Sequence, residues 1–140
     1  MISRRIPNSY SIWFIPGGKK FSILEKKIIE ISQFFEGIIF IPHLTLISNL
    51  DYSQNTLSKK VGRIAKLINP FKIYFDEIEY LNEFFQSFFI SVKTNTQLTN
   101  ARNIAQLKFS EIDEQYNPHL SLAYGNIQSK EKEELKKKIQ

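Results

Sequence analysis

A five-residue motif that occurs twice constrains the fold of this chain more than any other feature. The motif reads PHLTL at residues 42–46 and PHLSL at residues 118–122, so only one hydroxyl residue differs. The two copies contain the only histidines of the chain, and these lie 76 residues apart. Solenoid repeats have periods of roughly 20–50 residues. The spacing therefore predicts a duplicated domain with two lobes.

Hydrophobic spacing predicts alternating strands and helices. Aromatic and β-branched runs indicate strands, and apolar residues three and four apart indicate helices. The expected strands cover 10–15, 38–48, 71–80, 84–92 and 118–125. The expected helices cover 21–35, 57–68, 98–107 and a last one from 129, with polar loops at 49–56 and 111–117. Residues 71–92 read as a hairpin, which favours an α+β fold with antiparallel pairing over a doubly wound parallel sheet.

Composition sets the limits on the class of protein. The 140 residues fit one domain, 1–140, and 42% hydrophobic with 24% charged residues is typical of globular proteins. No apolar run is long enough for a membrane span or a signal peptide, so we expect no membrane partner, and the absence of cysteine points to the cytoplasm. The absence of cysteine excludes disulfides and thiolate chemistry. The net charge of +5 favours anionic ligands, although much of the excess lies in residues 136–138.

Strand geometry places the polar residues of each motif together. Residues i and i+2 of a strand point to one face, so His43 and Thr45 share a face, as do His119 and Ser121. The motif leucines occupy the opposite face. If the leucines pack beneath the helices, two imidazoles and two hydroxyls face a common groove.

Two histidines can supply both a base and an acid, because their unperturbed pKa lies near 6.5. Hydrolysis of a cyclic phosphodiester needs this pair, one to activate water and one to protonate the leaving oxygen. The hydroxyls can hold the phosphoryl oxygens, and no metal or cofactor is required. A zinc site is the alternative interpretation. It usually needs three protein ligands, and neither motif contains an Asp or Glu.

In these motifs the chain resembles the 2H phosphoesterase superfamily, which is marked by two His-x-Thr/Ser motifs. Within it, residues 10–13, 42–46, 85–87 and 118–124 resemble the cyclic phosphodiesterase family. The resemblance implies a bilobal fold with an antiparallel sheet in each lobe, helices outside and the active groove between the lobes. It also implies that His43 and His119 are the acid and base, of which we favour His119 as the base, and that Thr45 and Ser121 bind the phosphate.

Three aromatic residues are candidates for substrate binding. Trp13 and Phe85 could stack on a base. In a chain with twelve phenylalanines core packing is the simpler role for Phe85, so Trp13 is the better candidate. Tyr124 matches a family tyrosine near the phosphate, and a plain packing role is an equal alternative for it. Strict alternation from His119 points Tyr124 to the other face, so only a bulge or the end of the strand could turn it toward the site.

The resemblance implies metal-independent hydrolysis of 2′,3′-cyclic phosphates on small nucleotides, either nucleoside cyclic phosphates or ADP-ribose 1″,2″-cyclic phosphate. The expected products are the 2′-phosphate and the 1″-phosphate. The alternatives are a 2′-5′ ligase or phosphodiesterase acting on an RNA 3′ end, and a binder of cyclic-phosphate RNA ends without turnover. Family members continue with further strands after the second motif, so an open sheet edge could form a homodimer here.

Overall fold

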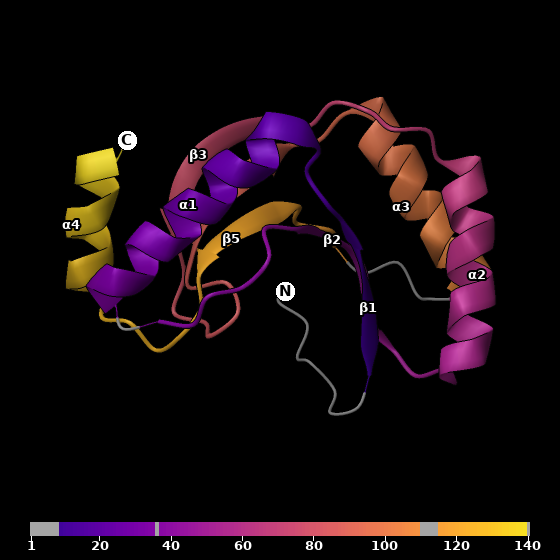
Figure 1. Cartoon of the computed structure of the whole chain (residues 1–140), viewed down its shortest axis with the longest axis horizontal. Coiled ribbons are helices and arrows are strands. Elements are labelled where there is room, and N and C mark those ends of the chain that lie inside the picture. Colours follow the sequence, from indigo (N-terminus) through magenta and orange to yellow (C-terminus); the bar gives the residue numbers. More distant parts are fainter. Residues whose placement is uncertain (1–8, 36, 110–114, 140) are drawn as a thin grey trace. The chain divides into compact units, whose positions relative to one another are not determined.

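The structure is a computed structural model that describes residues 9–35, 37–109 and 115–139 (Figure 1). Each half of the chain has a strand, a helix, a motif strand and a second helix, with one additional strand between the halves. The elements are β1 (Tyr10–Phe14), α1 (Gly18–Phe35), β2 (Leu44–Leu50), α2 (Gln54–Leu67), β3 (Tyr74–Tyr80), β4 (Phe88–Lys93), α3 (Thr96–Phe109), β5 (His119–Ala123) and α4 (Ser129–Ile139). The expected α+β class with antiparallel pairing is confirmed.

Two compact units divide the chain, and each combines three separate segments. The described part of the first unit, residues 9–14, 45–74, 93–109 and 115–118, contains β1, α2, α3 and all of β2 except Leu44. In this unit β1 lies beside β2, and α2 packs against α3. The helices cover an apolar core formed by Leu46, Ile47, Leu50, Leu57, Ile64, Ala101, Ala105 and Phe109.

The second unit contains α1, β5, α4, all of β3 except Tyr74 and all of β4 except Lys93. Its strands follow the order β5-β4-β3, and α1 packs on β5. The motif leucines Leu120 and Leu122 lie in its core, as expected from their face of the strand. The buried core residues are Leu24, Ile28, Ile31, Phe88, Leu120, Leu122, Ala123 and Leu135.

The strand expected at 38–48 begins six residues later, at Leu44. Pro42 has no amide hydrogen to donate to a neighbouring strand, so it interrupts any ladder that includes residues 38–43. Three isoleucines in this stretch, Ile38, Ile39 and Ile41, are more than half exposed. The prediction of a strand there rested on the isoleucines and leucines of the run, but these three isoleucine side chains are too exposed for burial to favour a strand.

The hairpin of β3 and β4 is confirmed, but its strands are shorter than expected and the connection is longer. Residues 71–73 precede β3, where the Phe71 ring packs edge-on against Phe14 with centroids 5.3 Å apart. Residues 84–87 belong to the turn rather than to β4. The amide of Leu81 donates to the carbonyl of Ser87 at 3.2 Å and closes this turn.

Two helices begin earlier than their apolar residues suggest, because polar residues cap them. The Ser53 hydroxyl accepts a bond from the Thr56 amide at 3.3 Å, so α2 starts at Gln54. The Asn95 side chain accepts a bond from the Leu98 amide at 2.8 Å, so α3 starts at Thr96. The loop expected at 111–117 falls partly outside the described residues.

No helix in the described ranges combines the length and the apolar character that crossing a membrane requires. The pseudo-symmetry of two lobes, the groove between them, the single domain over 1–140 and the dimer through a sheet edge stay predictions.

We predict that Gly125→Ala destabilises the protein. Gly125 follows β5 with a φ of 129°, a conformation that side-chain-bearing residues rarely adopt, and its amide donates to the Phe84 carbonyl at 2.9 Å. Forcing alanine into such a region costs about 1–3 kcal/mol, which urea denaturation will measure as a lower free energy of unfolding. Gly17→Ala is the matched control, because Gly17 is exposed with open space around it. Equal stability of the two variants would contradict the strain at Gly125.

Candidate active site

The pairing of the two motif strands sets the geometry of the candidate site in the second unit. Leu44 pairs with Leu120 in an antiparallel register. Extending this register by one residue places His43 opposite Ser121, on the face away from the paired leucines. His119 lies two residues from Ser121 on that same face. Diagonal neighbours across an antiparallel pair are about 7–8 Å apart, which is a suitable separation for two imidazoles around one small anion.

The ring of His43 is buried, with 4% of its surface exposed, and a backbone group holds it. Its Nδ1 lies 2.7 Å from the carbonyl oxygen of Ile41. A carbonyl oxygen can only accept, so Nδ1 carries the hydrogen and donates it. Proton transfer at His43 is therefore left to Nε2.

A register shift in β5 turns Tyr124 toward His43. Phe89 pairs with Ser121 and Phe88 pairs with Ala123, so Leu122 is an extra residue in the ladder. Adjacent residues of β4 point to opposite faces, so Ala123 lies on the core face with Phe88, and Tyr124 returns to the face of Ser121. The Tyr124 hydroxyl lies 3.4 Å from Nε2 of His43. The bulge required for Tyr124 to reach the site is therefore present.

Aromatic rings surround Tyr124. The ring of Phe40 stacks on it with centroids 4.0 Å apart and an interplanar angle of 22°. Phe85 meets it edge-on at 5.4 Å, and 42% of the Phe85 surface is exposed. The ring of Phe40 also lies edge-on to His43, with centroids 6.2 Å apart. Phe85 is thus outside the buried core and beside the expected phosphate-contacting tyrosine, while Phe40 was missed by the sequence analysis because residues 38–41 read only as a strand.

Ser121 is buried, and its hydroxyl donates to the carbonyl of Phe85 at 3.0 Å. A serine hydroxyl has one hydrogen to donate, so in this structure the donor is used inside the protein. To hold a phosphoryl oxygen, Ser121 would have to redirect that hydrogen. The hydroxyl also fixes the backbone beside the Phe85 ring.

His119 is half-buried at the start of β5 and pairs with Ser91 of β4. Its ring meets Phe89 edge-on, with centroids 5.3 Å apart. Phe89 is the pairing partner of Ser121, so this contact keeps the His119 ring over the face that carries the motif residues.

Thr45 and Trp13 belong to the first unit. Thr45 is half-buried, and its carbonyl accepts a bond from the Tyr116 hydroxyl at 2.7 Å. Trp13 is 36% exposed on β1, whose neighbouring residues Ile12 and Phe14 pack on the core of that unit. Trp13 thus points away from that core.

The backbone of β2 is fixed by Arg102 and Tyr116 in the first unit. Arg102 donates from Nη1 to the carbonyl of Leu46 at 2.7 Å, and its guanidinium lies 4.8 Å from the centre of the Tyr116 ring. Burial raises the pKa of Tyr116, although the charge of Arg102 acts in the opposite direction. Tyr116 therefore keeps its hydrogen for the Thr45 carbonyl over the range in which histidines titrate.

Lys132 of α4 is a buried cation that the sequence analysis missed, because it lies in a run of charged residues that reads as an exposed face. Only 1% of its surface is exposed. Its Nζ donates to the Leu81 carbonyl at 2.8 Å and lies 3.4 Å from the Ser87 hydroxyl. Burial lowers the pKa of Lys132. These bonds fix both ends of the turn that contains Phe85.

Metal ligands do not cluster in the described ranges: no group of three or more His, Cys, Asp or Glu there is arranged to hold an ion.

Comparisons with known proteins agree with the motifs. Residues 8–140 match the model of a family described as cyclic phosphodiesterase-like protein. The range includes both motifs and every described helix and strand. A cyclic phosphodiesterase of Arabidopsis thaliana is 23% identical over 130 residues, which cover 92% of this chain and 72% of that relative.

We predict that Lys132→Met lowers the free energy of unfolding by about 1–3 kcal/mol, because it leaves the Leu81 carbonyl without a donor while keeping most of the side-chain volume. Chemical denaturation will measure the change. Lys137→Met, on the exposed side of the same helix, should change stability by less than about 0.5 kcal/mol. If the two substitutions have the same effect, Lys132 does not fix the turn.

Proposed function

The chain belongs to the cyclic phosphodiesterase-like protein family, and from this premise we propose that it hydrolyses 2′,3′-cyclic phosphates on small nucleotides. The substrate is a nucleoside 2′,3′-cyclic phosphate or ADP-ribose 1″,2″-cyclic phosphate. The products are the 2′-phosphate and the 1″-phosphate, respectively.

One observation carries the proposal further than the family alone. The register of β2 and β5 gives His43, His119 and Ser121 a common face within the second unit, with Tyr124 turned to the same side. Residues from both motifs thus meet at one place, as a reaction that needs two proton carriers requires.

In the proposed reaction, His119 takes a proton from water, whose oxygen attacks the phosphorus. The bond from phosphorus to the 3′ oxygen breaks, and Nε2 of His43 gives this oxygen a proton. The bond between Nδ1 of His43 and the Ile41 carbonyl supports this role, since it directs the other ring nitrogen toward proton transfer. Each acid or base group typically contributes a factor of about 10²–10⁴ to the rate.

Neutral hydroxyl groups stabilise the negative charge that develops on the phosphoryl oxygens. We assign this role to Thr45 and to Ser121, whose hydrogen moves from the Phe85 carbonyl to the phosphate when substrate binds. The Tyr124 hydroxyl, 3.4 Å from His43, contacts the same oxygens. The rings of Phe85 and Trp13 stack on the base of the nucleotide.

We expect His43→Ala and His119→Ala each to lower kcat on a nucleoside 2′,3′-cyclic phosphate by about 10²–10⁴-fold. Phosphorus NMR of the product mixture measures turnover and identifies the phosphate formed. Circular dichroism shows whether each variant is folded. Near-normal turnover by either folded variant would refute the assignment of that histidine.

The pH profile provides a separate test of two-histidine catalysis. The rate of the unaltered protein should show a bell-shaped dependence on pH, because one imidazole must be neutral and the other charged. The residual rate of each alanine variant should lose one limb of the bell. A profile with both limbs intact in both variants would assign the titrating groups elsewhere.

A further inference from the structure

The positive charge of the chain is concentrated in the first unit. By sequence, the segments that form this unit carry a net charge of +6, whereas those of the second unit carry −1. The lysines near the C-terminus contribute little to the imbalance, because α4 combines five lysines with three glutamates. The first unit therefore has a source of positive charge of its own.

That source is the pair of packed helices α2 and α3. Together they contain six lysines and arginines and no Asp or Glu. In the described part of the first unit, Asp51 is the only carboxylate side chain. The basic residues of the two helices are Lys59, Lys60, Arg63, Lys66, Arg102 and Lys108.

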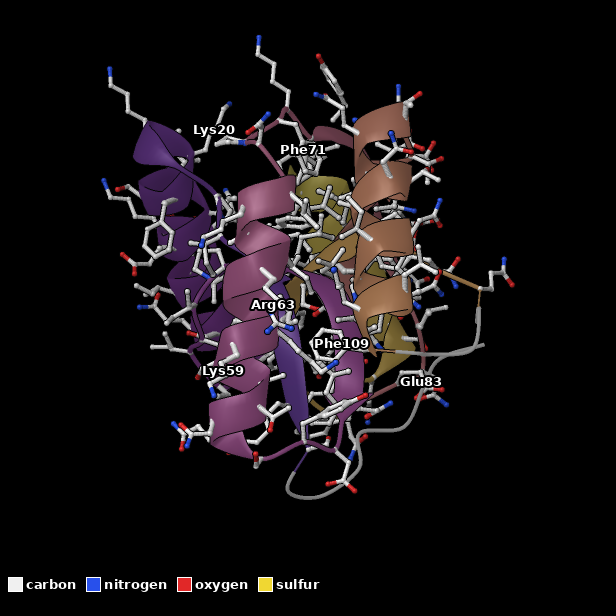
Figure 2. All side chains as sticks on the ribbon, turned by 90° about the vertical axis from the view of Figure 1, so that its right-hand side faces the viewer. Lys20, Lys59, Arg63, Phe71, Glu83 and Phe109 are labelled. Atoms are coloured by element: carbon white, nitrogen blue, oxygen red, sulfur yellow. The ribbon has the colours of Figure 1, made fainter. Side chains whose placement is uncertain are left out.

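Three of these residues form a row on the outer side of α2. Lys59, Arg63 and Lys66 follow one another at spacings of four and three, which places them on one face of the helix. All three are exposed, and Figure 2 labels Lys59 and Arg63 on α2. The buried residues Leu57 and Ile64 lie on the opposite face. The row spans about 10 Å along the helix axis.

Two of the other basic residues, Lys60 and Arg102, make contacts within the unit that do not involve the three residues of the row. Lys60 donates to the carbonyl of Lys108 at 2.8 Å and lies over the Tyr52 ring. Arg102 donates to the Leu46 carbonyl. Both residues fix α2 and α3 within the unit and still contribute their charge to the surface.

We propose that the basic row of α2 binds the sugar–phosphate backbone of an RNA strand. A row of positive charges about 10 Å long fits consecutive phosphates of a nucleic-acid strand better than it fits a single small anion. A lipid surface fits less well, because membrane-bound amphipathic helices insert their apolar face, and the apolar face of α2 is buried in the core. The choice of RNA over DNA rests on the chemistry of the proposed function rather than on its small substrates, because a strand can end in a 2′,3′-cyclic phosphate only if it has the 2′-hydroxyl of RNA.

The experiment measures binding of a fluorescein-labelled 20-nucleotide RNA with a 3′-hydroxyl, by anisotropy between 50 and 200 mM salt. This RNA cannot be turned over, so binding is tested apart from catalysis. The triple variant Lys59→Gln, Arg63→Gln, Lys66→Gln should lower the slope of log K against log salt by about 2, at roughly 0.7 for each lost phosphate contact with a single strand.

A matched control removes the same charge from the second unit. For the variant Lys130→Gln, Lys136→Gln, Lys137→Gln on α4, the slope of log K against log salt should change by less than about 0.7, the value for one phosphate contact. Equal losses in the two variants would show that net charge alone binds RNA, and would overturn the proposal. Absence of RNA binding by the unaltered protein at 50 mM salt would do the same.

Two further measurements complete the test. Vesicles of phosphatidylserine should bind the α2 variant and the unaltered protein alike, and a loss confined to vesicles would assign the row to lipid instead. The α2 variant should keep its kcat/KM on a cyclic mononucleotide, and a loss there by a folded variant would overturn a purely RNA-binding role. If neither the unaltered protein nor the α2 variant hydrolyses the mononucleotide, the proposed function is wrong, whereas the proposal of RNA binding is still tested by the salt slopes.

Discussion

The antiparallel pairing of Leu44 with Leu120 is the constraint on which the candidate site depends. The leucines face the core side, so the residues next to them must face the other side. This is why two motifs 76 residues apart in sequence present His43, His119 and Ser121 on one surface of the second unit. The same burial of Leu120 that stabilises the core thus orients the polar residues.

Backbone carbonyls hold three polar side chains around this site. The Ile41 carbonyl accepts from His43, the Phe85 carbonyl from Ser121 and the Leu81 carbonyl from Lys132. All three carbonyls belong to irregular segments beside the strands, where no ladder uses them. Because such carbonyls need donors when buried, each bond both satisfies the backbone and fixes a side chain. The shape of the site is therefore coupled to the stability of the segment before β2 and of the turn between β3 and β4.

The sequence predicted the elements whose signals are local. Apolar spacing located the first three of the described helices, the order of acidic and basic residues located the last one, and the repeated motif located β2 and β5 within a few residues. The error at 38–43 arose because β-branched residues favour strands chiefly where neighbours pack on them, and the Ile38 and Ile39 side chains are more than half exposed. The pattern of charged residues in the sequence also led to wrong expectations. Lys132 reads as one more solvated lysine until tertiary packing buries it, and the imbalance of charge between the units depends on which segments fold together.

The extra residue at Leu122 has a consequence for tracing this site through evolution. A relative that lacks one residue between the equivalents of Ser121 and Tyr124 can form a regular strand there, and a tyrosine four places after the motif histidine then lies on the site face by simple alternation. Conversely, a relative that keeps tyrosine five places after the motif histidine has an equivalent side chain only if its strand keeps the same irregularity. Counting residues between the histidine and the tyrosine is thus more informative in homologues than the percentage of identical positions.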